Sequence, residues 1–134
     1  MESLLTERFR ALGAALGLTS FDTRRDGQIT ELYLYDRHAL QMEIDWRENN
    51  LFLYAVRLRD RRLPERDIVY RYGDGQLCRT YLEAVYQVKR TEPVDPQRRY
   101  SEAYLWECFD FYEGLIMAAP TVLLEFFNDM DERV

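Results

Sequence analysis

Residues 39–47 read ALQMEIDWR and carry the clearest alternation of apolar and polar side chains in the chain. The two alternating sets are Leu40, Met42, Ile44 and Trp46 against Gln41, Glu43, Asp45 and Arg47. Because successive side chains of a strand point to opposite faces of its sheet, this period of two predicts a half-buried strand with one polar face.

Strand-like segments lie on both sides of this one, and short turn sequences separate them. Residues 28–35 alternate in the same way after an Asp-Gly turn signal, and residues 51–59 begin with a run that is apolar on both faces. Three neighbouring strands with short connections predict an antiparallel meander. After a charged loop at 57–66, the short apolar segment 67–72 is expected to add an edge strand.

Segments whose apolar residues have helical spacing lie before and after these strands in the sequence. The expected helices are residues 4–17, residues 77–90, residues 100–115 and a segment that starts at Pro120. The first of them has an amphipathic stripe that ends at Gly17. This order predicts one α+β domain over residues 1–134, with an N-terminal helix, an antiparallel meander sheet of three to four strands, and three C-terminal helices. Two-layer packing is expected, with the helices mostly on one sheet face.

Negative charge is concentrated in residues 100–134. This segment holds eight carboxylates and one base, whereas residues 1–99 hold 16 acids and 17 bases, so the formal net charge of -6 arises entirely in the last segment. The same segment includes eight aromatic residues, which make it too apolar for a disordered acidic tail. A folded surface that is both acidic and aromatic predicts a protein partner with a basic surface.

The composition disfavours several classes of function. Net negative charge argues against a nucleic-acid ligand, because phosphate binding requires a cationic surface. The longest apolar stretch, residues 115–124, is too short for a membrane span and contains Pro120. The first residues lack the features of a secretory signal, so a cytoplasmic location is expected. Cys78 and Cys108 lack the spacing of a metal or redox site and are expected to be buried thiols.

Residues with catalytic or metal-binding chemistry are few. The one histidine, His38, falls in a predicted turn, where we expect it to be solvated and without the partners of a zinc site or a triad. Glu43 and Asp45 share a strand face and could divide into an acid and a base, but an open face would leave their pKa values ordinary. The acidic cluster at 128–132 lacks the glycine and the later glutamate of a calcium loop. We therefore expect no catalytic residues, no metal site and no cofactor.

Two surfaces are candidates for partner binding. The first is the polar sheet face, where acidic and tyrosine side chains gather: Glu31, Tyr33, Tyr35, Glu43 and Asp45. The second is the exposed side of the helix at 100–115, with the candidates Trp106, Glu107, Asp110 and Glu113. Carboxylates suit a partner that displays Arg and Lys, and tyrosine gives contact area at low entropic cost. The alternatives are that the sheet face is solvated or covered by the C-terminal helices, and that the helix face is only solvated.

The middle of the chain resembles a group of small bacterial proteins. The segments that carry this resemblance are LQMEIDWRE at 40–48, LFLYAVRL at 51–58, Leu63-Pro64 and YGDG at 72–75. They resemble immunity proteins found beside polymorphic or contact-delivered toxins, over roughly residues 38–85. The resemblance implies a cytoplasmic protein that binds a cognate toxin and blocks it, with acidic groups occupying a basic active site.

A second resemblance gives the alternative hypothesis. An acidic protein of this size that begins with a helix, here LLTERF at 4–9, and continues into strands is similar to class I type III secretion chaperones. Those are dimers that hold an extended effector segment, so this resemblance implies a homodimer. The chain departs from it at residues 76–90, because that family places a helix before two more strands. A small enzyme that uses Glu43 and Asp45 is the third hypothesis, and a homodimer is compatible with any of the three.

Overall fold

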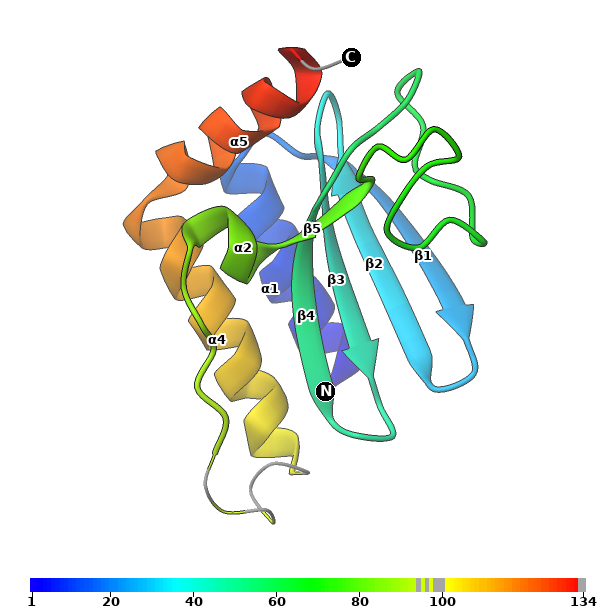
Figure 1. Cartoon of the computed structure of the whole chain (residues 1–134). Coiled ribbons are helices and arrows are strands. Elements are labelled where there is room, and N and C mark those ends of the chain that lie inside the picture. The colour runs from blue at the N-terminus through cyan, green and yellow to red at the C-terminus, as the bar shows by residue number, and fades with distance from the viewer. Residues whose placement is uncertain (94, 96, 98–100, 133–134) are drawn as a thin grey trace.

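The sheet of this computed structural model is a continuous antiparallel meander (Figure 1). Its strands, in spatial and sequence order, are β1 (Ser20–Asp26), β2 (Ile29–Tyr35), β3 (Ala39–Asp45), β4 (Asn50–Val56) and β5 (Arg79–Tyr81). The structure describes residues 1–93, 95, 97 and 101–132, and for 131 and 132 it describes the backbone alone. The predicted meander is confirmed, with one strand more than the three to four expected.

The long helices cover one face of this sheet. The helices are α1 (Glu2–Ala15), α2 (Leu82–Tyr86), α4 (Glu102–Ala118) and α5 (Pro120–Glu132). Their apolar stripes and the side chains that the strands send to that face form one core, whose members include Phe9, Phe109, Phe127, Leu34 and Met42. The result is the predicted α+β packing of helices on one side of an antiparallel sheet.

A long connection between β4 and β5 covers part of the opposite face. Residues 57–78, the 57–78 segment below, fold back over the ends of the central strands (Figure 1). Under this segment lies a second, smaller core, which is built from Ala39, Tyr54 and Val56 and is flanked by Leu58 and Leu63. From the sequence, this face could be either solvated or covered by the C-terminal helices. The 57–78 segment, and not a helix, is what covers it.

Strand β1 was not predicted. Its sequence, SFDTRRD, is largely exposed and sends only Phe21 and Arg24 into partly buried positions, so it lacks the alternation of a half-buried strand. It forms because the turn at Gly27 brings it beside β2, where all of its residues pair with the backbone of β2, from Asp26 opposite Ile29 to Ser20 opposite Tyr35.

The predictions for residues 67–90 were wrong in two places. The expected edge strand at 67–72 is not a strand of the sheet: the carbonyls of Ile68 and Val69 accept hydrogen bonds from the Arg79 guanidinium, and Arg71 forms only an isolated antiparallel bridge with Leu77. The expected helix at 77–90 is confined to α2, because residues 79–81 pair with β4 as β5. Helix α2 then ends at Gln87, which adopts a left-handed conformation.

Candidate functional site

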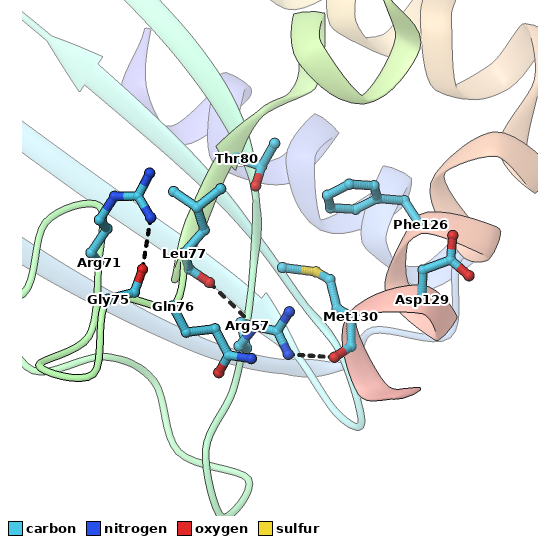
Figure 2. A pocket seen from close by; sticks show the side chains of 9 residues that line it. All are labelled: Arg57, Arg71, Gly75, Gln76, Leu77, Thr80, Phe126, Asp129 and Met130. Atoms are coloured by element: carbon cyan, nitrogen blue, oxygen red, sulfur yellow. Dashed lines mark hydrogen bonds between the residues drawn. The ribbon is translucent and has the colours of Figure 1, made fainter. Parts of the chain in front are cut away.

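A hollow in the described structure lies between α5 and the β5 edge of the sheet. This hollow, called the α5 cleft below, has a volume of about 490 Å³. Nine residues line it: Arg57, Arg71, Gly75, Gln76, Leu77, Thr80, Phe126, Asp129 and Met130. Figure 2 shows Leu77 and Thr80 facing Phe126 and Met130 across the hollow, with Arg57 at its base. An apolar interior with a few charged groups at its margin is typical of a binding site.

The two walls of the α5 cleft follow from local sequence. On the sheet side, Thr80 pairs with Ala55, so it faces the helical layer while its neighbours Arg79 and Tyr81 face the other way. On the helix side, Phe127 and Met130 are buried in the core, and Phe126 lies half-buried at the cleft. The amphipathic stripe of α5 therefore ends at the cleft and leaves part of its apolar surface open.

Arg57 holds the two walls together. Its Nε donates to the Leu77 carbonyl at 3.2 Å, and its Nη1 donates to the Met130 carbonyl near the end of α5. Its backbone carbonyl also accepts a hydrogen bond of 2.6 Å from the Tyr72 hydroxyl. Because this buried guanidinium bridges the sheet and α5, the cleft is fixed in the folded protein before any partner arrives.

The solvent-facing side of α5 is acidic. Among the α5 side chains that the structure describes are two carboxylates, Glu125 and Asp129, and no base. Glu125 and Asp129 are both exposed, and no ion pair of the described residues involves either of them. Asp129 therefore contributes an exposed carboxylate to the α5 cleft, whose lining also includes Arg57 and Arg71, and Glu125 lies one helical turn before Asp129.

The five residues predicted on the polar sheet face do share one face. Glu31 lies directly opposite Glu43, and Tyr33 lies opposite Gln41, on the side away from the helices. Tyr35 and Asp45 also project to this side, at opposite ends of the sheet. The alternation seen in the sequence therefore placed these side chains correctly relative to one another.

This face is not the open acidic surface that the sequence suggested. Tyr33 is completely buried, and Glu31 and Glu43 are half-buried around a hollow of only about 40 Å³ that Arg66 and Arg79 also line. The guanidinium of Arg79 donates to Tyr33 at 2.7 Å and to the Gln41 side chain at 2.5 Å. Arginines of the chain itself thus occupy the acidic face, and the remaining hollow has room for little more than water.

The electrostatics of this face also differ from expectation. Burial, together with the like negative charge of Glu31, raises the pKa of Glu43 above its usual range, whereas an ordinary value was predicted. Burial and the hydrogen bond that the Tyr33 hydroxyl donates to Glu31, 2.6 Å long, raise the pKa of Tyr33 to about 12. Asp45 instead accepts hydrogen bonds from the backbone of Arg47 and Glu48, so its carboxylate stabilises the turn after β3.

The four candidate residues of α4 divide into two groups. Arg8 of α1 forms ion pairs with Asp110 at 3.1 Å and with Glu113 at 2.7 Å, and it lies 5.4 Å from the centre of the Trp106 ring. Glu107 lies on another side of α4, where it lines a small hollow beside Arg90. The helix does not bring all four together, and two of its acids are neutralised within the chain.

Two further expectations have definite outcomes. His38 is not a solvated turn residue: its ring stacks on Phe127 of α5, with centroids 4.8 Å apart and an angle of 5° between the planes. The physical reason is that the turn between β2 and β3 lies against α5, whose apolar stripe includes Phe127. Cys78 and Cys108 are free, buried thiols, as predicted.

Sequence reasoning missed most of the α5 cleft. Glu125 and Asp129 belong to the acidic segment at 100–134, and residues 128–132 invite comparison only with a calcium loop, whose pattern they do not match. The amphipathic pattern of α5 indicated a helix with exposed acids. Leu77 gave no such signal, since its place in the cleft depends on the path of the 57–78 segment.

The chain matches no family model, no curated protein and no solved structure. Within the described part of the chain, no helix combines the length and the apolarity needed to cross a bilayer. The same residues contain no group of three or more His, Cys, Asp or Glu side chains arranged to hold a metal ion.

Proposed function

We propose that this chain is a non-enzymatic protein-binding protein that docks a basic partner against α5 and the α5 cleft. One observation carries the proposal: the exposed carboxylate of Asp129 lines a preformed, partly apolar hollow of about 490 Å³, and the exposed Glu125 lies one helical turn before it on α5. The specific form that we propose is an immunity protein, which binds a cognate toxin and blocks it. That form is supported by the resemblance of residues 38–85 to such proteins.

The shape of the α5 cleft supports binding of an apolar side chain. Affinity in protein interfaces is concentrated in a few anchors that fill desolvated pockets, and charged groups at the rim guide association and orient the partner. Phe126, Leu77 and Met130 supply the apolar lining, and Asp129 supplies a rim charge. A toxin surface with an apolar residue flanked by Lys or Arg would fit this arrangement.

The groups in the α5 cleft favour binding over catalysis. The charged side chains among its nine lining residues are two arginines and one carboxylate, with no histidine, cysteine or serine among them. Arg57 is engaged by the carbonyls of Leu77 and Met130, where it supports the structure. Such groups can pair with a partner, but they do not form the nucleophile and base that catalysis requires.

Two further observations bear on the proposal. A reducing cytoplasm is the location we propose, in keeping with the free thiols of Cys78 and Cys108. Residues 16–81 contain strands, turns and the 57–78 segment but no helix. This order departs from the helix followed by two strands that the chaperone resemblance implies, and it favours the immunity hypothesis.

The experiment is capture followed by a neutralisation assay. Tagged chain is used to capture proteins from its native cells at low and at high salt, and each captured protein is expressed in a bacterial host with and without the chain. We expect one partner that binds less at high salt, stops growth when expressed alone, and is tolerated when the wild-type chain is present.

Charge-reversal variants connect this result to α5. E125K/D129K should lower affinity by at least about tenfold and abolish the growth rescue, because it places positive charge against a basic partner. E48K, which reverses an exposed acid in the turn between β3 and β4, is the matched control and should rescue growth fully. Equal rescue by E125K/D129K would show that the binding surface is wrong. A captured partner that is harmless alone would contradict the immunity function.

A further inference from the structure

Strand β1 forms an open edge of the sheet along its whole length. It pairs with β2 on one side, and on its other side no strand of the described residues pairs with it (Figure 1). At the opposite end of the sheet, the edge strand β5 has only three residues, which pair with the second half of β4, and the Arg90 side chain bonds to the Leu51 carbonyl and the Asn50 side chain in the first half. The β1 edge is therefore where another strand can add to this sheet.

The backbone groups available at this edge can be identified from the ladder. The Trp46 amide donates to the Gln28 carbonyl, so the backbone groups of Gln28 point toward β3, and those of its neighbour Ile29 point toward β1. Ile29 lies opposite Asp26, so Asp26 forms backbone hydrogen bonds with β2. Because the direction of the backbone groups alternates along a strand, the other even-numbered residues of β1 also bond to β2. The odd-numbered residues, Phe21, Thr23 and Arg25, present their N–H and C=O groups outward. Consistent with this, the Thr23 amide donates at 2.8 Å to the side chain of Asp22.

We propose that β1 pairs antiparallel with β1 of a second copy of this chain, centred on Thr23, to form a continuous sheet through a two-fold axis. In this register Thr23 meets Thr23 of the second copy, and Phe21 meets Arg25 of the second copy, as hydrogen-bonded pairs. A centre between two residues would instead pair odd-numbered with even-numbered residues and direct the wrong backbone groups at each other. Centring on Thr23 also overlaps all seven residues of Ser20–Asp26.

The side chains of β1 are complementary to themselves in this register. Asp22 lies opposite Arg24 of the second copy, and Arg24 lies opposite Asp22 of the second copy, both as non-hydrogen-bonded pairs, in which side chains are closest. Arg24 is already positioned, because it donates to the Pro64 carbonyl at 2.6 Å and its guanidinium stacks on the Tyr33 ring. Asp22 would exchange its bond to the Thr23 amide for this guanidinium, and the amide would gain a backbone carbonyl.

The helical side of this edge also suits a second copy. A groove of about 470 Å³ lies between α1 and β1, with Phe21 and Leu32 among its lining residues. Arg10 stacks on the Phe21 ring at 4.7 Å, which shows that this ring accepts a guanidinium. In the proposed dimer Arg25 of the second copy lies beside the same ring. The interface lies at the opposite edge of the sheet from the α5 cleft, so it is independent of the proposed function.

The test is the solution mass of the full chain by sedimentation over a range of concentrations. Wild type should approach twice the monomer mass as concentration rises. D22R and R24D each place like charges opposite each other and should raise the dissociation constant by at least about tenfold. An equimolar mixture of D22R and R24D should form a heterodimer, since every charged pair across the new interface is then complementary.

Two further measurements keep the result independent of folding defects. T23P removes an outward N–H without removing a bond of the β1–β2 ladder, so it should abolish the dimer while melting close to wild type. Hydrogen exchange at the amides of Phe21, Thr23 and Arg25 should slow as concentration rises. A wild-type chain that stays monomeric at all concentrations would overturn the proposal. A dimer that D22R and T23P leave unchanged would also overturn it.

Discussion

The guanidinium of Arg79 on β5 donates a 2.7 Å hydrogen bond to the hydroxyl of Tyr33 on β2, reaching across two intervening strands. The same group donates to the carbonyls of Ile68 and Val69, at 2.6 and 2.7 Å. One buried arginine therefore attaches the 57–78 segment to the sheet face. The segment stays in place through polar contacts as much as through its small apolar core.

Replacing Arg79 with methionine should destabilise the fold strongly. Methionine keeps most of the apolar volume but leaves the carbonyls of Ile68 and Val69, which the arginine satisfied, without donors. We expect a loss of about 3 kcal/mol in the free energy of unfolding, measured with urea. R62M, at an exposed arginine, should change it by less than about 0.5 kcal/mol. Equal effects of the two variants would mean that the Arg79 contacts contribute nothing to the free energy of unfolding.

Glu43 should make the stability of the protein depend on pH in an identifiable way. Its pKa is raised in the folded state by burial and by the charge of Glu31, so the folded chain holds this proton more tightly than the unfolded chain. Stability relative to E43Q should therefore fall as pH rises from the ordinary carboxyl range through the raised pKa, and stay level above it.

The measurement for Glu43 is urea unfolding of wild type and E43Q at a series of pH values. E31Q provides the mechanistic control, because it removes the neighbouring negative charge and should lower the pKa of Glu43. The E31Q variant should therefore lose stability relative to the E31Q/E43Q double variant over a narrower pH range than wild type does relative to E43Q. A difference between wild type and E43Q that is constant with pH would contradict the prediction.

Two helical glycines should respond to alanine in opposite directions. A Cβ on Gly13 of α1 would lie 2.5 Å from the Leu34 side chain and 3.1 Å from the Leu18 carbonyl, whereas a Cβ on Gly114 of α4 meets no atom within 4 Å. We expect G13A to cost about 1–3 kcal/mol through overpacking. G114A should stabilise the chain by up to about 1 kcal/mol through helix propensity. Thermal melts of both variants test this, and a neutral G13A would show that the α1–β2 contact can yield.

Both thiols should be protected from chemical modification in the folded chain. Burial raises the pKa of Cys78 and of Cys108, which lowers the fraction of reactive thiolate as well as access to it. Alkylation near neutral pH should be at least about tenfold slower in the native chain than in urea. C78S and C108S assign the rate to each site. A thiol that reacts equally fast in both states would contradict the burial described here.

The sequence predicted those parts of the fold in which side-chain periodicity reflects burial directly. Strands β2 and β3 alternate because one face of each packs on helices, and α1 has a single apolar stripe. Strand β1 escaped prediction because an edge strand with few buried side chains needs no alternation. In residues 77–88 the spacing of Leu77 and Val88 was helical by coincidence, since both side chains are exposed.

The candidate site was harder to predict, for a related reason. Alternation correctly placed Glu31 and Glu43 on one face, but it carried no information about the 57–78 segment that covers them. Likewise, the acids of α4 appeared available until the fold placed Arg8 beside Asp110 and Glu113. Local pattern assigns a side chain to a face, and tertiary contacts decide whether that face is free.

The bond between Arg57 and the Met130 carbonyl also has a consequence for folding. It joins residues 73 positions apart, and the Arg8 ion pairs join residues 102 and 105 positions apart, whereas the meander pairs close neighbours. Because loop closure costs more entropy at larger separation, we expect the hairpins to form early and α5 to dock late. A chain caught before that step would have most of its sheet but no α5 cleft, so partner binding would report completion of folding.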